Sequence, residues 1–300
     1  AYTEQLICNW VQAQAQKLQF SKLALAGGVF ANVKLNQRLL ALPEIDNIYV
    51  HPNMGDGGLA TGAAYEVYSR LQNGLIPKLQ PHVYLGTEIN RETALAALEK
   101  SGLAYSEPDN LSYTVAKLLA AGKVVARAAG GKVVARAAGK MEYGPRALGN
   151  RTVMASCQDK AINQWLNEKF ARTEFMPFAP VIIEEQAQAY FPDWREDHVA
   201  ARFMTLTYDA SAIAQKNIPA AVHVDNTARP QVIRRVDNPD YYDIINDYYQ
   251  LTGVASVINT SFNMHEEPIV RTAEEAIQAF QAAQLDALIL DSFLIEQASN

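Results

Sequence analysis

The sequence predicts a mixed α/β protein in two blocks, an α/β lobe over residues 1–78 and an α+β domain over residues 79–300. Three observations predict this. Strand-like and helix-like runs alternate over residues 1–75, which is typical of a mostly parallel sheet. The stretch 72–81 then contains Asn73-Gly74 and two prolines, the composition of a linker. Beyond it, helix-like and strand-like runs follow one another without a regular order. The 300 residues are enough for two domains of ordinary size.

The first block is predicted to hold three helices and two short strands. The helices are expected over 6–18, 29–42 and 60–71, and the strands over 22–26 and 47–50. Each strand is followed by a turn rich in glycine, Gly27-Gly28 after the first and 55–58 after the second. Ligands of open α/β sheets bind outside the carboxyl ends of the strands. Both turns are therefore candidate ligand contacts.

The second block is predicted to contain five helices and at least four strands. Thr272 and Glu275 have the spacing of a capping box at the start of the last helix. The expected helices are 92–100, 113–121, 159–170, 241–252 and 272–283, and the expected strands are 202–208, 220–224, 254–258 and 285–290.

One nonamer, Gly-Lys-Val-Val-Ala-Arg-Ala-Ala-Gly, occurs twice in succession, at 122–130 and 131–139. The unit is too short for a solenoid repeat, whose period is about 20 to 50 residues. One copy has the pattern of a strand, and identical copies give the chain little reason to prefer either register. We interpret the repeat as a duplication and assign it no chemistry.

Composition and charge exclude several classes of protein. Apolar residues make up 49% and charged residues 19%, as in a globular chain. The net charge of −6 argues against a general nucleic-acid binder. Cys8 and Cys157 lack metal-site spacing, no run is long enough to span a bilayer, and no secretory signal is present. We expect a cytoplasmic protein that binds no membrane.

The segment from Glu142 to Arg151 is the strongest indication of a ligand site. It contains Arg146 and Arg151, and guanidinium groups bind phosphate or carboxylate oxygens two at a time. Gly144 and Gly149 let the main chain approach a ligand closely. These residues predict an oxyanion pocket, and the alternative is a surface turn with two solvated arginines.

A second polar turn follows a β-branched strand at Asn259-Thr260-Ser261-Phe262-Asn263. Its amides and hydroxyls can bind an amide head or phosphate oxygens without adding charge. We predict Ser261 to be a ligand and not a nucleophile, because no His-Asp pair near it in the sequence would activate it. The alternative is an ordinary polar turn at a strand end.

These motifs together resemble the O-carbamoyltransferases of the nodulation and antibiotic-tailoring type. The resemblance covers nearly the whole chain, with its motifs in the expected order. The matching stretches are 26–32 with 55–58, 141–151, Arg172 with Pro177-Phe178-Ala179-Pro180, 224–230, and 259–263 with 267–270.

The resemblance implies two domains and a reaction. Residues 1–78 are similar to the last part of an actin/sugar-kinase-like nucleotide-binding domain, and residues 79–300 to a YrdC-like domain. Enzymes of this family use ATP and carbamoyl phosphate to form carbamoyl-adenylate, and then transfer the carbamoyl group to a hydroxyl of a small molecule. The expected partners are therefore ATP, carbamoyl phosphate, a hydroxyl-bearing acceptor and a further amino-terminal lobe that this sequence lacks.

The resemblance and the residue chemistry together predict the site residues. Arg146, Arg151, Arg229 and Ser261 are the expected catalytic groups, with Lys169, Arg172, Asn259 and Asn263 as further contacts to carbamoyl phosphate. Gly27, Gly28, Asn32 and Gly57 are the expected nucleotide contacts, and Asp56 is the expected ligand of a divalent metal, Mg or Fe.

The sequence departs from the family pattern in two places. The family shares its metal between an aspartate and two histidines four residues apart, and no such pair occurs here, so the metal site is expected to be incomplete. Met176 also stands where relatives often carry another arginine.

Two other functions stay open from the sequence. One is a threonylcarbamoyl-adenylate-forming factor for transfer RNA, against which the acidic balance counts. The other is a noncatalytic binding module that retains the fold.

Overall fold

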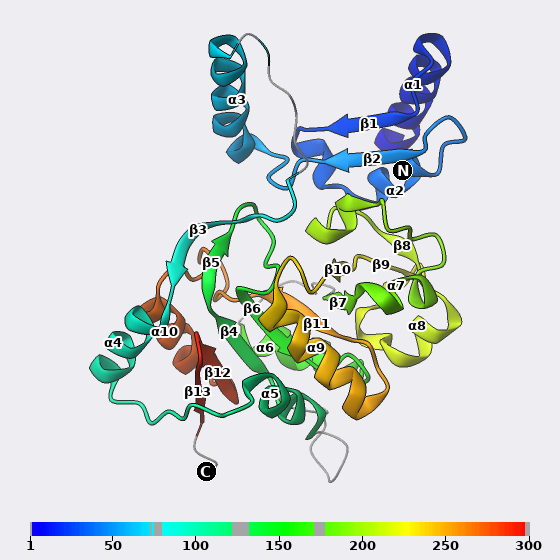
Figure 1. The fold of residues 1–300 in the computed structure, drawn as a ribbon. Coiled ribbons are helices and arrows are strands. Elements are labelled where there is room, and N and C mark those ends of the chain that lie inside the picture. Colours follow the sequence, from blue (N-terminus) through cyan, green and yellow to red (C-terminus); the bar gives the residue numbers. More distant parts are fainter. Residues whose placement is uncertain (1, 73, 75–79, 122–131, 171–177, 298–300) are drawn as a thin grey trace.

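The computed structural model describes residues 2–72, 74, 80–121, 132–170 and 178–297. Figure 1 draws a smaller first block, residues 2–72, above a larger second block, residues 80–297. Helices and strands alternate in the first and mix around one large sheet in the second. The predicted mixed α/β class is confirmed.

The first block is built on two parallel strands, paired from Lys22 with Asn47 to Leu25 with Val50. Helix α2 packs against α1 and β2. Leu35 and Leu39, one helical turn apart, give α2 a buried face. The elements are α1 (Tyr2–Leu18), β1 (Lys22–Leu25), α2 (Val33–Leu40), β2 (Asn47–Val50) and α3 (Leu59–Leu71).

The second block contains a seven-stranded mixed sheet in the order β10-β7-β11-β6-β4-β12-β13. The pairs β10–β7 and β12–β4 are parallel and the other four pairs are antiparallel. Four of the five inner strands, β7, β6, β4 and β12, are buried along their full lengths, so they form the core. The strands are β4 (Val134–Ala137), β6 (Arg151–Ala155), β7 (Ala179–Ile183), β10 (Gln231–Ile233), β11 (Ser256–Ser261), β12 (Ala287–Leu290) and β13 (Phe293–Glu296).

Two smaller strand pairs and seven helices surround this sheet. Helices α5 and α9 pack on each other, α5 against β4 and α9 against β7 and β11, whereas α10 packs on α4, β4 and β12. The antiparallel strand pairs are β3 (Tyr84–Ile89) with β5 (Gly139–Glu142), and β8 (Tyr208–Asp209) with β9 (Thr227–Ala228). The helices are α4 (Arg91–Ser101), α5 (Leu111–Ala120), α6 (Ala161–Lys169), α7 (Glu184–Tyr190), α8 (Ala212–Asn217), α9 (Pro239–Thr252) and α10 (Ala273–Ala283).

The register of the sheet decides which side chains share a face. Thr152 pairs with Ser261 on one side and with Arg136 on the other, so these three side chains lie on one face. Arg151, the neighbour of Thr152 on β6, points to the opposite face. Arg136 lies over the ring of Tyr241 from α9, which places α9 on the Thr152 face.

The two blocks are joined by buried and half-buried hydrogen bonds. The side-chain amide of Asn36 donates to the carbonyl oxygen of Thr205 at 2.8 Å, and the hydroxyl of Thr207 donates to the amide oxygen of Gln37 at 2.9 Å. The core of the first block is continuous with that of the second.

Most predicted helices are confirmed, and the capping box of Thr272 and Glu275 is present. Three predictions are wrong. The expected helix 29–42 is divided, because Asn32 ends a short 3-10 helix and caps α2. The expected strands 202–208 and 220–224 contain 3-10 turns instead, the first ending at Met204 with a positive φ of 57°.

Among the described residues, no helix is both long and apolar enough to cross a membrane.

Candidate active site

The arginine loop, residues 143–150, connects β5 to β6 and contains two glycines that the fold requires. Gly144 and Gly149 have φ values of +114° and +122°, which other residues rarely adopt. A Cβ atom on Gly149 would lie 2.2 Å from the Tyr241 ring, and one on Gly144 would lie 3.0 Å from the Pro52 carbonyl oxygen. The loop therefore fits closely between α9 and the glycine-rich turn of the first block.

Arg146 and Arg229 come together although 83 residues separate them in the sequence. Burial, and to a smaller extent the charge of Arg146, lowers the pKa of Arg229 to about 9. Burial also lowers the pKa of Arg146, and its Nε is buried without a hydrogen-bond partner. Neither guanidinium has an ion-pair or hydrogen-bond partner among the described residues. Two like charges without a counterion among the described residues would be stabilised by an anion.

The acidic residue nearest Arg229 in the sequence is already paired. Asp225 forms an ion pair with Lys34 of the first block at 3.1 Å. It also accepts a hydrogen bond from the Thr227 hydroxyl at 2.7 Å. The imidazole of His223 also lies near Arg229, and burial lowers the pKa of His223. Neither Asp225 nor His223 therefore neutralises Arg229, and its charge is available to a ligand.

The structure corrects the role predicted for Arg151. Its side chain is fully buried, and it donates to the carbonyl oxygens of Ala138, Asn150, Thr87 and Arg271 at 2.8–3.3 Å. It also lies on the sheet face opposite Ser261. Arg151 therefore holds strands together through their carbonyl groups.

Asn259 also has a structural role and not the predicted contact to substrate. Its amide donates to the carbonyl oxygen of Ala147 at 2.9 Å and to the amide oxygen of Gln231 at 2.7 Å, and its oxygen accepts from Thr152. The residue is buried, so no hydrogen-bonding group is left for a ligand. Asn259 instead fixes the arginine loop to β11.

Ser261 and Asn263 keep groups that a ligand can use. Ser261 is half-buried and points to the same face as Asn259, two residues or about 7 Å further along β11. The amide nitrogen of Asn263 donates to the carbonyl oxygens of Met264 and Glu267, whereas its oxygen is buried without a partner among the described residues. Their roles as carbamoyl contacts stay a prediction.

One predicted cation, Lys169, is directed away from the arginine pair, and another lies outside the described residues. Lys169 donates to the side-chain oxygen of Gln284 at 3.3 Å and lies over the ring of Trp165, so its ammonium is directed to the end of α10. Arg172, like Met176, lies outside the described residues.

The predicted nucleotide contacts lie in the turns that follow β1 and β2. Gly27 donates to the Met54 carbonyl oxygen at 2.6 Å, which joins the two turns, and the space beside Gly28 is open. A side chain on Gly57 would collide with Asn53. The oxygen of Asn32 accepts from the Leu35 N–H, so it serves the helix cap and is not free for a ribose.

Asp56 lies exposed in the second turn, at the start of a 3-10 helix. No group of three His, Cys, Asp or Glu side chains in the described part of the chain could hold a metal ion. The described donors therefore do not fit a metal site by themselves, and Asp56 stays a predicted ligand whose partners would have to come from elsewhere.

The hydroxyl of Tyr143 joins the arginine loop to the first block. The Tyr143 hydroxyl lies 3.2 Å from His51 Nε2 and 2.7 Å from the Thr61 hydroxyl. His51 follows β2 and Thr61 lies in the first turn of α3, so both flank the turn that carries Asp56. Burial lowers the pKa of His51, which favours a neutral imidazole at this junction.

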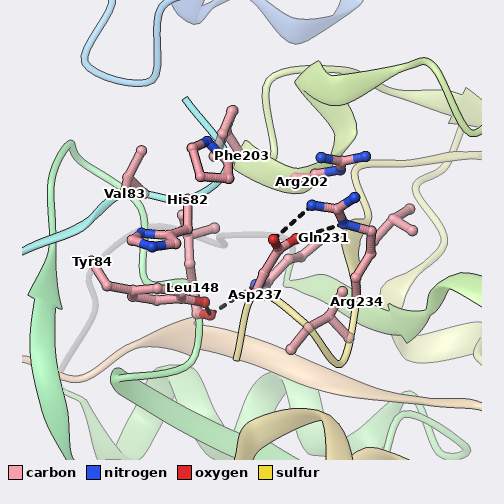
Figure 2. Close-up of a pocket in the computed structure, with 12 residues that line it drawn as sticks. His82, Val83, Tyr84, Leu148, Arg202, Phe203, Gln231, Arg234 and Asp237 are labelled. Atoms are coloured by element: carbon pink, nitrogen blue, oxygen red, sulfur yellow. Dashed lines mark hydrogen bonds and ion pairs between the residues drawn. The ribbon is translucent and has the colours of Figure 1, made fainter. Parts of the chain in front are cut away.

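Two cavities have residues of the loop in their walls, and neither is lined by Arg146 or Arg229. The first, shown in Figure 2, has a volume of about 20 Å³ and is bounded by Leu148, Gln231, Arg202 and Tyr84. It has room for about one water molecule. The second, of about 370 Å³, lies between the starts of α5 and α9, and Arg136 in its wall is hydrogen-bonded to the loop.

Sequence reasoning missed the groups that hold the loop, above all Glu142 and Gln231. Glu142 is the first residue of the arginine motif. An acidic residue at this position was the one sequence signal that could have indicated its role. Gln231 lies two residues after Arg229, and nothing in the sequence marked it.

Known proteins are similar in sequence to this chain along nearly its whole length. A family model described as the carbamoyltransferase C-terminus matches residues 116–297, and the carbamoyltransferase N-terminus matches residues 1–65. An uncharacterised protein of Methanocaldococcus jannaschii is 32% identical over 99% of this chain and 48% of its own length. Nodulation protein NolO of Bradyrhizobium diazoefficiens is 33% identical over 98% of this chain and 53% of its own length.

One solved structure, full-length HypF in its phosphate- and nucleotide-bound form, superposes with a TM-score of 0.40 and 17% identity. The match covers 64% of this chain and 22% of HypF. The chain spans about half the length of the curated relatives it matches. Both family models match in order, and the first of the two curated relatives aligns along nearly the whole chain. The chain belongs to the carbamoyltransferase family.

Proposed function

We propose that this chain supplies the anion-binding part of an ATP-dependent carbamoyltransferase. In the proposed reaction, carbamoyl phosphate, ATP and water give carbamoyl-adenylate, pyrophosphate and phosphate, and the carbamoyl group then passes to a hydroxyl of a small molecule. The observation that supports this proposal is that Arg146 and Arg229, both half-buried, have no counterion among the described residues.

In this proposal the two guanidinium groups bind phosphoryl oxygens. Negative charge develops on these oxygens as the mixed anhydride forms, and cations that are already in place stabilise the transition state more than the ground state. A pKa of about 9 leaves Arg229 charged at neutral pH. The hydroxyl of Ser261 and the free oxygen of Asn263 would bind the neutral carbamoyl head, whose amide hydrogens need acceptors.

The test is calorimetric titration of the chain with carbamoyl phosphate and with ATP. R229A and R146A should each weaken carbamoyl phosphate binding by about tenfold to a hundredfold, because each removes charge-assisted hydrogen bonds. R235A is the matched control, since Arg235 is exposed and paired with Asp243. Unchanged affinity in R229A, or no heat from either ligand with the folded chain, would refute the proposal. Pyrophosphate release that depends on threonine and bicarbonate would favour the transfer-RNA factor instead.

A further inference from the structure

The conformation of the arginine loop depends on one buried carboxylate. Glu142 is 7% exposed and ends β5, immediately before the loop. Its Oε1 accepts hydrogen bonds from the backbone N–H groups of Leu148, Asn150 and Arg151 at 2.7, 2.8 and 3.1 Å. A single oxygen therefore joins the start of the loop to its end.

The carbonyl groups of the same loop are held from other elements. Those of Ala147, Leu148 and Gly149 accept hydrogen bonds from the side chains of Asn259, of Tyr84 and Gln231, and of Arg136, at 2.7–2.9 Å. These donors come from β11, β3, β10 and β4. The N–H groups of Leu148 and Asn150, by contrast, both donate to the same oxygen of Glu142.

No described residue fixes the guanidinium of Arg146 in place. Its side chain makes no hydrogen bond to a described residue, and Arg229 repels it. The position of its guanidinium thus follows from the backbone of the loop. Without a firm backbone, repulsion between the two cations would move them apart.

We infer that Glu142 is the positioning residue of the anion site and acts through Arg146. This inference rests on the proposed function. By closing the loop over three N–H groups, Glu142 holds Arg146 beside Arg229 before any ligand arrives. A ligand then meets a preformed pair of cations and does not have to order the loop, which raises its affinity.

The test compares E142Q, which keeps an oxygen of the same reach but loses the charge, with E142A, which loses both. We expect E142Q to weaken carbamoyl phosphate binding by about tenfold and E142A to weaken it further, since charge-assisted hydrogen bonds are about twice as strong as neutral ones. The amides of Leu148, Asn150 and Arg151 should exchange hydrogen faster in both variants. V153A, which makes a cavity in the neighbouring strand β6, controls for a general loss of stability and should leave the affinity unchanged.

A double-mutant cycle separates positioning from a merely structural role. If Glu142 acts through Arg146, then E142Q should change the affinity of R146A by less than about twofold. Additive losses, or wild-type affinity in E142Q despite faster exchange, would overturn the inference. Titration with inorganic pyrophosphate distinguishes the two proposals. A wild-type chain that binds pyrophosphate but not carbamoyl phosphate refutes the proposed function alone, and the cycle is then run on pyrophosphate. A wild-type chain that binds neither overturns both.

Discussion

At the scale of single residues, partners decide the roles of similar side chains. Arg146 and Arg151 are five residues apart in one motif, yet Arg151 donates to carbonyl groups whereas Arg146 has no partner among the described residues. The carbonyl groups around Arg151 come from Thr87, Ala138 and Arg271, which are distant in the sequence. The anion site predicted from the motif stays a prediction, and the sequence could not tell which of the two arginines is held by carbonyl groups.

His198 shows how burial makes stability depend on pH. It is 3% exposed, its Nδ1 lies 3.1 Å from the Tyr208 hydroxyl, and burial lowers its pKa below the ordinary 6.5. Below pH 6.5 the unfolded chain binds a proton at this site that the folded chain resists. The contribution of His198 is thus present above pH 6.5 and is lost as the pH falls.

We therefore expect the unfolding free energy to decrease between pH 7.5 and pH 5.5, and to decrease less in H198N. Urea denaturation at both pH values, followed by circular dichroism, measures this difference. Equal pH dependence in the two proteins would show that His198 does not contribute.

At the scale of helices and strands, the periodicity of apolar residues predicted most elements. It failed where 3-10 turns have the alternating polarity that is typical of a strand. Helices such as α9 and α10 have a clear apolar stripe and a cap, and both were predicted to within two residues. The segments 202–208 and 220–224 alternate in polarity but contain 3-10 turns, since Met204 takes a left-handed conformation that ends the first of them. Such conformations depend on tertiary packing, which a single sequence does not reveal.

The repeated nonamer gives a prediction about one strand. The second copy contributes β4, an inner strand of the sheet. The N–H of Lys132 donates to the Leu118 carbonyl oxygen at 3.1 Å, so the end of α5 already lies beside the approach to β4. Residues 122–130 are therefore not needed to connect the end of α5 to the start of β4.

Deletion of residues 122–130 should leave the fold intact, because Ala121 and Gly131 can still join Leu118 to Lys132. We expect the deletion variant to have a thermal midpoint at or above that of the parent chain, since a shorter loop costs less entropy to close. Differential scanning calorimetry checks this. R136A in the same background is a control that should be destabilised, because Arg136 is buried and holds the Gly149 carbonyl oxygen. A deletion variant that fails to fold would show that the first copy has a structural role.

At the scale of the whole molecule, the first block leaves apolar side chains in solvent. Tyr2, Leu6 and Trp10 recur every four residues along α1 and are 81%, 57% and 65% exposed, and we call them the α1 stripe. Helix α3 has no buried residue. An apolar stripe of this kind is uncommon on a monomeric surface and marks a region suited to contact with other chains.

Substituting both Leu6 and Trp10 by glutamine should reduce binding of an apolar fluorescent dye and reduce light scattering at high protein concentration. The unfolding free energy should change by no more than about 0.5 kcal/mol, because these side chains bury little surface. V236Q is a matched control, since Val236 is 81% exposed and lies in the second block, outside the stripe. Unchanged dye binding in the double variant would contradict the expectation.

The hydroxyl of Tyr143 links the arginine loop to the smaller lobe. It bonds both His51 and Thr61, and it belongs to the residue that follows Glu142. Any hinge motion that lifts the smaller lobe must break both bonds together, and it pulls directly on the chain that carries Arg146. If the cation pair binds an anion as proposed, we expect its occupancy to be coupled to docking of the lobe, so that each would strengthen the other by the same free energy.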